Sequence, residues 1–321
     1  MAHDHGHGRH KGNVSRKLVA ASIVTALFVL VELTAGWYAH SLALMGDALH
    51  NVTDALALIL ALIAVRLEQR PATEEKSFGY QRAGILAAFV NSGTLVAFTV
   101  FIFIEAFERF RAPGPVQTTL MMITAAVAIV LNGAITLSLR HEGKDDVNIR
   151  SAVLHMLGDA ISSAGIIVAA ILIRVTGSTR WDPLISVLIG VLILWSSWGI
   201  LREAVNLLLE GTPSTIDPAE VTRALGALAG VQGVHHLHIW ALGPSSPAMS
   251  CHILVGDVPV RNTAQMLDEV TGMLQRSFRI AHTTIQFEHA KCADDDPYCI
   301  PYTASASSQL SAVSSQEELE S

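Results

Sequence analysis

Charged residues are scarce in this chain of 321 residues: they make up 15% of it, whereas hydrophobic residues make up 51%. In an average soluble domain about 25% of the residues are charged. Together with a mean hydropathy of +0.44, this scarcity excludes an ordinary soluble globular protein. The composition predicts a membrane protein that carries a smaller soluble part.

Cysteine is also scarce, with three residues, Cys251, Cys292 and Cys299. Three cysteines do not build a disulfide framework, which is typical of small secreted proteins. The N-terminal stretch is polar, so we do not expect it to be a cleavable signal peptide. We therefore expect the soluble part to lie in a reducing cytoplasm, with its cysteines as free thiols or metal ligands.

Signatures of several enzyme and pump classes are missing from the sequence. There is no His-Glu-x-x-His motif, which argues against an intramembrane metalloprotease, and no Walker A loop, which argues against an ATP-driven pump. A nucleophile with its base and orienting group is not recognisable either. We expect no enzyme activity, and any active transport must draw its energy from an ion gradient.

Six apolar stretches are long enough to cross a bilayer, which takes about 20 residues in a helix. Basic residues favour the N-terminal tail and the connections after the second and fourth stretches, eleven against four in the alternate connections. This bias places both termini in the cytoplasm, which agrees with an even number of spans, since that requires both termini on the same side. The stretches run roughly over residues 18–38, 42–65, 83–107, 118–139, 152–175 and 183–208.

The long apolar stretches give way to shorter amphipathic segments after the sixth stretch. An amphipathic helix, with Asp217 as N-cap before Pro218, precedes two alternating strands, a second helix and a third strand. This order, αββαβ, predicts a small α+β domain with one sheet. The expected elements cover residues 216–228, 234–242, 249–255, 263–278 and 283–288. The expected domains are a His-rich tail (1–15), a membrane domain (16–210), the α+β domain (211–291) and a disordered Ser-rich tail (292–321).

The net negative charge of the chain comes from its C-terminal part. From Thr212 onward 12 acidic residues face 5 basic ones, and the preceding residues are balanced. An acidic appendage argues against nucleic acid and anionic lipid as partners and favours cations. The N-terminal tail carries His3, His5, His7 and His10, which either are simply solvated or collect metal ions transiently.

Two His-x-x-x-Asp motifs interrupt the second and fifth apolar stretches: His50 with Asp54, and His155 with Asp159. Residues four apart share one face of a helix, so two such helices offer two nitrogens and two oxygens, a set suited to tetrahedral Zn²⁺. An Asp at membrane depth costs about 2.5–3.5 kcal/mol on insertion scales. The repetition favours a metal site over plain hydrogen bonding between helices.

Other polar residues lie in the same apolar stretches. Asp47 lies one turn before His50 on the same helix face. It is either a relay carboxylate or an entry ligand, or else a residue at the helix start that is hydrogen-bonded to the backbone. Asn51 is offset by about 100° from His50 and is not expected to be a ligand. Asn91 and Asn132 are expected to form hydrogen bonds between helices.

Further candidate ligands lie in the soluble part. If its hairpin is centred on Ser245, His238 and His252 face each other across the two strands. His282 opens the third strand and Glu288 closes it, and these four residues predict a second metal site. The alternative is a set of ordinary surface histidines on a half-exposed sheet.

Two other pairs of residues are weaker candidates for that site. His235 and His236 are adjacent in a strand, so their side chains point to opposite faces and at most one can join a shared site. Cys292 and Cys299 are spaced C-x₆-C, which is wider than a usual zinc knuckle.

These motifs resemble those of the cation diffusion facilitators, a family of divalent-metal/proton antiporters. The likeness rests on HSLALMGDALHNVTDALAL, SAVLHMLGDAISSAG, GVHHLHIWAL and HTTIQFE, and it covers roughly residues 19–288. It implies six spans, cytoplasmic termini and a homodimer with a ferredoxin-like or metallochaperone-like cytosolic domain. It also implies that His50, Asp54, His155 and Asp159 form the transport site, and that members with His at the first position transport zinc.

This sequence departs from some members of the family. The connection after the second stretch lacks an Asp/His cluster, and the connection after the fourth has the single His141 rather than a long His-rich loop. The resemblance further implies that His238, His252, His282 and Glu288 occupy metal positions of the cytosolic domain.

We therefore expect a multi-pass protein of a bacterial inner membrane that exports Zn²⁺, or other divalent transition metals, in exchange for H⁺. Zn²⁺ is expected also as a regulatory ion, which would neutralise acidic charge and let the two soluble domains of a dimer approach each other. A membrane metal sensor is the alternative, although it needs no buried site at membrane depth. A passive channel is disfavoured because four ligands release an ion slowly.

Overall fold

The computed structural model of the protein describes residues 24–140 and 147–289. The chain divides into two compact units. The helical domain combines Met1–Leu67 with Leu86–Arg202, and the sheet domain combines Glu68–Ile85 with Glu203–Ser321. The sheet domain therefore includes the connection between the second and third apolar stretches in addition to the C-terminal part of the chain.

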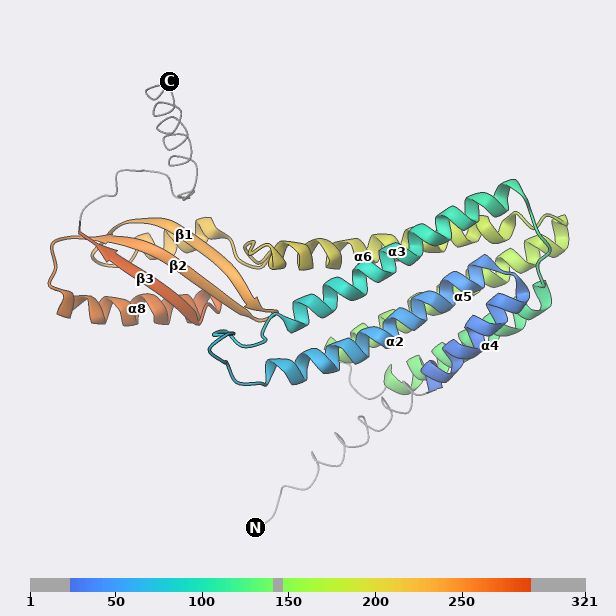
Figure 1. Cartoon of the computed structure of the whole chain (residues 1–321), viewed down its shortest axis with the longest axis horizontal. Helices are drawn as coiled ribbons and strands as arrows, with labels where there is room; N and C mark the ends of the chain where they lie inside the picture. Colours follow the sequence, from blue (N-terminus) through green and yellow to red (C-terminus); the bar gives the residue numbers. More distant parts are fainter. Residues whose placement is uncertain (1–23, 141–146, 290–321) are drawn as a thin grey trace, which may run out of the picture. The chain divides into compact units, whose positions relative to one another are not determined.

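Within the described residues, five helices have the length and composition needed to cross a membrane. A shorter apolar helix, described over Val24–Ala39, precedes them, and the expected start of the first span lies outside the described residues. The helical bundle predicted from the sequence is thereby confirmed (Figure 1). The five helices are α2 (Leu42–Glu68), α3 (Ala83–Arg111), α4 (Thr118–Arg140), α5 (Val147–Thr176) and α6 (Trp181–Leu208).

Large apolar side chains point outward from this bundle. Leu58 is 64% exposed, and Ile104 and Leu188 are each 57% exposed. Such a surface is unfavourable in water but matches the hydrocarbon core of a bilayer, where lipid tails are as apolar as leucine. The outer surface therefore agrees with a membrane-spanning bundle.

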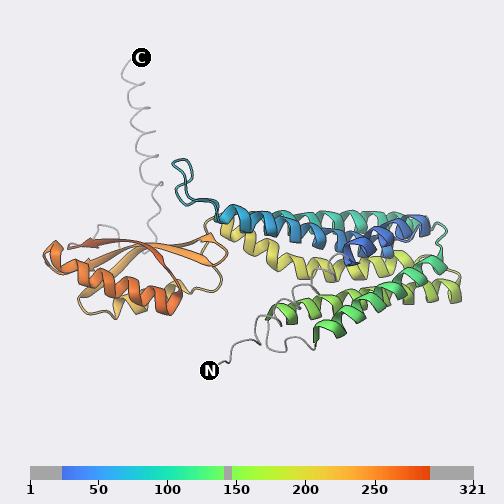
Figure 2. The ribbon, with the colours of Figure 1, turned by 90° about the horizontal axis from the view of Figure 1, so that it is seen from below.

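Small residues fill the inside of the bundle, where they let the helix backbones approach closely. Two views show α4 lying along α5 (Figures 1 and 2). The first apolar helix, α2, α4 and α5 share one buried core, which joins α2 to α5. Its alanines are Ala35, Ala39, Ala43, Ala125, Ala169 and Ala170.

The start of α2 is anchored by a residue of α6. The carboxylate of Asp182 accepts hydrogen bonds from Ser41 Oγ at 2.6 Å, from the backbone N–H of Leu42 at 2.7 Å and from that of Ala43 at 3.2 Å. The first N–H groups of a helix have no partner inside the helix, so Asp182 caps α2 from a neighbouring helix. This contact fixes the position of α2, which carries His50 and Asp54.

The sheet domain follows the predicted αββαβ order. It consists of α7 (Pro218–Gly226), β1 (Val231–Gly243), β2 (Ser246–Val255), α8 (Val260–Phe278) and β3 (His282–Glu288). The strand order is β1-β2-β3, with β1 antiparallel and β3 parallel to β2. At the start of α7, Asp217 accepts a hydrogen bond from Ala219 N–H at 2.9 Å, so the predicted N-cap is confirmed.

Both helices of this domain share one core with the sheet. Val221 and Leu225 from α7, and Val270 and Leu274 from α8, pack with Met249, Cys251 and Ile253 of β2. Because side chains alternate along a strand, the residues between these β2 positions face away from the helices. His252 is one of them.

Candidate metal centres

The structure brings together the four residues of the two His-x-x-x-Asp motifs, here called the quartet. His155 Nε2 lies 3.2 Å from Asp54 Oδ2 and 3.7 Å from Asp159 Oδ2. His50 Nε2 lies 3.5 Å from Asp54 Oδ2 and 3.9 Å from Asp159 Oδ1. The two imidazole rings are 6.0 Å apart. Each carboxylate is therefore within reach of both imidazoles, one from its own helix and one from the other.

These distances suit a small divalent cation with tetrahedral geometry. Zn²⁺ bonded at about 2.0–2.2 Å to nitrogen and oxygen separates its ligand atoms by roughly 3.3–3.6 Å. The nitrogen–oxygen distances in the quartet, 3.2–3.9 Å, are already close to that spacing. His50, Asp54 and His155 already bring one ligand atom each within 4.8 Å of the others. Asp159, at 3.9 and 3.7 Å from the two imidazoles, could complete a set of four after an adjustment of its side chain.

Exposure differs across the quartet. The side chain of His155 is 41% exposed and that of Asp54 27%, whereas those of His50 and Asp159 are 17% and 6% exposed. The site is thus open on the His155 side and closed at Asp159.

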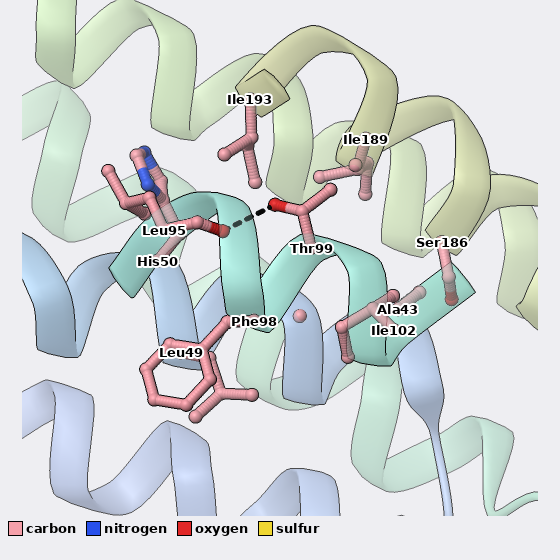
Figure 3. A pocket seen from close by; sticks show the side chains of 12 residues that line it. Ala43, Leu49, His50, Leu95, Phe98, Thr99, Ile102, Ser186, Ile189 and Ile193 are labelled. Carbon is pink, nitrogen blue, oxygen red and sulfur yellow. Dashed lines mark hydrogen bonds between the residues drawn. The ribbon is translucent and has the colours of Figure 1, made fainter. Parts of the chain in front are cut away.

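A narrow cavity between α2, α3 and α6 adjoins the quartet at His50 (Figure 3). Its volume is about 20 Å³, enough for roughly one water molecule. Its polar lining residues are His50, Thr99 and Ser186. The hydroxyl of Thr99 donates to the carbonyl of Leu95 at 2.8 Å, and that of Ser186 donates to the carbonyl of Asp182 at 2.8 Å. The cavity therefore adds no charged ligand to the quartet.

Two further carboxyl groups are buried in the helical domain. Glu32, on the first apolar helix, is 0% exposed and Asp47 is 1% exposed. Asn51 Nδ2 donates to Glu32 Oε2 at 2.9 Å, and Ser163 Oγ donates to Asp47 Oδ2 at 3.4 Å. Asn51 therefore binds Glu32 through its side-chain amide. This contact is compatible with the expectation that Asn51 is not a metal ligand.

A second cluster lies on the face of the sheet that is turned away from α7 and α8. His235 Nε2 and His252 Nδ1 each lie 2.9 Å from an oxygen of Glu288. The ring of His236 stacks on that of His252 with centroids 4.6 Å apart. One nitrogen from each of the three histidines lies within 4.8 Å of the others. These four residues, the sheet cluster, can hold a metal ion.

The strand register explains why this set differs from the predicted one. The turn lies between Gly243 and Ser246, so His238 pairs with Ser250, and the prediction that it faces His252 is wrong. A register shift between His235 and His238 then places His235 opposite His252. The predicted hairpin centre was displaced, and an extra residue in β1 was not foreseen.

The same irregularity overturns the expectation that His235 and His236 cannot share a site. His236 has a φ of +51°, a left-handed conformation that breaks the strand alternation, as residues in β-bulges do. Both imidazoles therefore reach His252. A regular strand would have sent one of them to the opposite face.

The remaining predicted ligands lie apart from the sheet cluster. His282 is exposed at the opposite end of β3 from Glu288, with its ring 5.3 Å from that of Phe78. His238 is exposed as well. Cys292, Cys299, His141 and the N-terminal histidines lie outside the described residues.

Two titratable groups of the sheet domain have shifted pKa values. Burial lowers the pKa of His252, and the neighbouring His236 and His235 lower it further against the opposing effect of Glu288. A neutral imidazole is the form that binds metal. Burial raises the pKa of the Cys251 thiol to about 12, and this side chain lies in the core on the opposite face from the cluster.

Comparison with known proteins shows the family of the chain that carries these two clusters. Residues 18–209 match the model of a cation efflux transmembrane domain, and residues 213–290 match that of the cytoplasmic domain of cation efflux proteins. The chain belongs to the cation diffusion facilitator family. The transmembrane model covers all six apolar stretches, so this cation diffusion facilitator is a multi-pass integral membrane protein.

Several characterised relatives span nearly the whole chain. Zinc transporter ZitB of Escherichia coli is 41% identical over 302 residues, which cover 92% of this chain and 95% of the relative. The metal cation efflux system protein CzcD of Cupriavidus metallidurans is 37% identical over 92% and 93%. A cadmium, cobalt and zinc/H⁺-K⁺ antiporter of Bacillus subtilis is 35% identical over 90% and 92%.

One solved structure is also similar to part of this cation diffusion facilitator. It is the metal-bound C-terminal domain of the CzcD transporter from Cupriavidus metallidurans, with 37% sequence identity and a TM-score of 0.21. The match covers 23% of this chain and 99% of that domain.

Sequence reasoning missed Glu32, and it allowed at most one of His235 and His236 in the cluster that contains both. Glu32 was detectable, since it is the single acidic residue within the first apolar stretch, and an intramembrane carboxyl group points to function. No sequence signal marked the bulge at His236, because left-handed positions favour Gly, Asn and Asp.

Proposed function

We propose that this protein exports Zn²⁺ from the cytoplasm in exchange for H⁺, with the quartet as its transport site, and that other divalent transition metals share the pathway. The observation that carries the proposal is the convergence of two imidazoles and two carboxylates from α2 and α5, with nitrogen–oxygen distances of 3.2–3.9 Å. Relatives named as zinc, cadmium and cobalt transporters support this range of substrates.

The donor set favours zinc among the common divalent ions. Imidazole suits zinc and its transition-metal neighbours, whereas Mg²⁺ and Ca²⁺ prefer oxygen ligands alone. Affinity among the transition metals rises from Mn²⁺ to Cu²⁺, so availability and geometry select the ion in the cell. The relatives named as zinc transporters support zinc as the principal substrate.

Exchange for protons follows from the chemistry of the ligands. A metal ion binds neutral imidazole and ionised carboxylate, so protons and metal compete for the same four side chains. Imidazole changes its charge near neutral pH, which suits such competition across a pH gradient. The site takes Zn²⁺ when it faces the cytoplasm and releases it when it faces the more acidic outer side. Alternating access of this kind is usual for secondary transporters.

The distribution of basic residues supports cytoplasmic termini, and the bacterial origin of the relatives supports the inner membrane as the location. The sheet domain then faces the cytoplasm. A match to the cytoplasmic domain of cation efflux proteins over residues 213–290 supports that side.

Reconstituted vesicles test the transport proposal. The purified protein is placed in proteoliposomes that contain a pH dye and a zinc dye, and Zn²⁺ is added outside. We expect Zn²⁺ uptake coupled to proton movement in the opposite direction. Asp159→Ala should lose both fluxes, and Asp257→Ala, which removes an exposed carboxylate of the sheet domain, should retain both. Coupled flux in Asp159→Ala would refute the site.

The alternative function, a membrane metal sensor, makes a different prediction in the same vesicles. A sensor would bind Zn²⁺ at the quartet without a flux of metal or protons. Zinc binding in detergent therefore accompanies the flux assay, and binding without flux would replace the transport proposal by the sensor.

We further propose that the sheet cluster binds a regulatory Zn²⁺ in a homodimer. The C-terminal part of each chain carries 12 acidic and 5 basic residues, so two such domains repel each other when no metal is bound. Zn²⁺ on the sheet cluster would reduce this repulsion and favour the closer arrangement. Spin labels on the two sheet domains should approach each other when Zn²⁺ is added, and an unchanged distance would contradict the proposal.

A further inference from the structure

Glu32 and Asp47 form a pair of buried carboxyl groups outside the quartet. The two side chains lie within hydrogen-bonding reach of each other. Their exposed fractions are 0% and 1%. Among the described residues, no lysine or arginine forms an ion pair with either of them. The pair is therefore a concentration of acidic groups at membrane depth without a compensating cation.

The hydrogen bonds of the pair leave two oxygens without a donor. Glu32 Oε2 accepts from Asn51, and Asp47 Oδ2 accepts from Ser163. Glu32 Oε1 and Asp47 Oδ1 are buried and have no donor among the described residues. An ionised carboxylate only accepts hydrogen bonds, so two ionised groups could not satisfy these oxygens.

A single shared proton would remove one of the two negative charges and would also supply the missing hydrogen-bond donor. Without a nearby cation, two carboxylates that share a buried site do not both ionise, because like charges in a low dielectric repel strongly. A proton on one of them turns it into a donor, and that donor can bond the free oxygen of the other. The geometry thus calls for a single proton held between Glu32 and Asp47.

We propose that Glu32 and Asp47 share one proton and form a proton-binding site, separate from the four metal ligands, that releases its proton when Zn²⁺ binds to the quartet. The proposal rests on the proposed antiport function and names two residues that contribute to its proton side. The proton leaves the carboxyl pair as H⁺, and the pair keeps one additional negative charge.

The link between the pair and the quartet is electrostatic. Asp159 is the quartet carboxylate whose negative charge repels a negative charge on both Glu32 and Asp47. While Asp159 carries a bare negative charge, a second charge on the pair is disfavoured and the proton stays. A bound Zn²⁺ brings two positive charges to the same place, so ionisation of the pair becomes favourable.

The helices that carry the quartet also carry the partners of the pair. Ser163 follows Asp159 by one turn of α5, and Asn51 follows His50 directly on α2. A movement of α2 against α5 during transport would therefore alter the hydrogen bonds that hold the proton.

Amide substitutions test the proposal with little disturbance of packing. In Glu32→Gln the side-chain oxygen can still accept from Asn51, and the new NH₂ group can donate to Asp47 in place of the shared proton. In Asp47→Asn the new NH₂ group can likewise donate to Glu32 in place of the shared proton. Glu105→Gln is the matched control, because Glu105 is a helical carboxylate paired with Arg109 at 2.8 Å and outside the pair.

The decisive measurement is the number of protons released per Zn²⁺ bound by the full-length protein in detergent. It is obtained by calorimetry in buffers of different ionisation enthalpy. We expect Glu32→Gln and Asp47→Asn each to release up to one proton fewer than the wild type, while Zn²⁺ still binds. In both variants the slope of log affinity against pH should fall by the same amount. Glu105→Gln should match the wild type.

Infrared difference spectroscopy gives a second readout. Zinc binding to the wild type should remove a carbonyl-stretching band of a protonated carboxylic acid, and this loss should be absent in Glu32→Gln and Asp47→Asn. Proton counts and spectra equal to the wild type in both variants would overturn the proposal, because the proton would then be permanent and structural.

These outcomes are separable from failure of the proposed function. If the wild type binds Zn²⁺ but moves neither metal nor protons in vesicles, antiport fails, and the proton count still shows whether the pair responds to metal. If Asp159→Ala abolishes transport and the pair variants release the wild-type number of protons, antiport stands and the carboxyl pair is not part of it.

Discussion

Asp182 provides a quantitative test of how the transport helix α2 is held in place. Its carboxylate receives three hydrogen bonds, from Ser41 Oγ at 2.6 Å, Leu42 N–H at 2.7 Å and Ala43 N–H at 3.2 Å. Asp182 is fully buried, with 0% exposure, so water cannot replace it easily. Asp182→Ala would leave all three donors without their acceptor.

The loss can be estimated from the contacts. Removal of an N-cap costs about 0.5–2 kcal/mol, and each buried donor left unsatisfied costs about 1–3 kcal/mol. Because neighbouring contributions are not additive, we expect a destabilisation of about 3–5 kcal/mol for Asp182→Ala. Asp182→Asn keeps one acceptor oxygen and should lose roughly half as much.

Thermal unfolding of the detergent-solubilised protein, followed by the loss of monodisperse protein on size exclusion, measures the effect. For chains of this size 1 kcal/mol corresponds to about 2–4 °C, so Asp182→Ala should lower Tm by at least about 6 °C. Asp257→Ala, in an exposed position, is the control. A decrease below about 2 °C in Asp182→Ala would refute the idea that this cap anchors α2.

Asp54→Ala should abolish Zn²⁺-driven proton flux in vesicles, since Asp54 Oδ2 contacts both imidazoles at 3.5 and 3.2 Å; normal flux would exclude Asp54 as a ligand. In the sheet domain, His236→Ala should weaken Zn²⁺ binding by at least about tenfold while His282→Ala leaves it unchanged, as calorimetry on the full chain can show; equal effects would contradict the strand register. Because burial lowers the pKa of His252, this imidazole should stay neutral and able to bind metal to a lower pH than an exposed histidine, and an NMR titration of the metal-free protein in which His252 protonates at or above the ordinary value of 6.5 would disagree.

The spans and the spacing within each motif could be predicted from sequence, because both depend on local periodicity. Apolar stretches of about 20 residues are a sufficient signal for spanning helices, and a separation of four residues places His50 and Asp54 on one face. That α2 lies against α5 was inferred only from the repetition of the motif. The contact itself depends on alanines such as Ala43 and Ala169, whose role is visible only in the packed bundle.

The hairpin register could not be predicted, because it depends on details of one or two residues. A turn displaced from Ser245 and an irregularity after His235 together move His238 away from His252 and bring in His236. A single-residue change in register reverses which side chains share a face of a sheet. The prediction therefore had His252 and Glu288 right, whereas His235 and His236 stand in place of the predicted His238 and His282.

The carboxyl pair shows a different limit of sequence reasoning. Asp47 was recognised as a relay or structural carboxylate, but its partner Glu32 comes from another helix and has no motif around it. The pairing exists because Asn51 and Ser163 hold the two groups from α2 and α5. Such an arrangement is tertiary by nature and has no local signature.

The graded exposure of the quartet has a consequence for the ions that the protein rejects. If the quartet is the transport site, a cation that enters from its exposed side would meet His155, at 41% exposure, before Asp159, at 6%, and would lose its hydration shell in stages. Mg²⁺ gives up water reluctantly and requires octahedral oxygen ligands, so it would stall at the first imidazole. Under the proposed function, Mg²⁺ would therefore be excluded by the order in which water is lost, before affinity at the completed site has any effect.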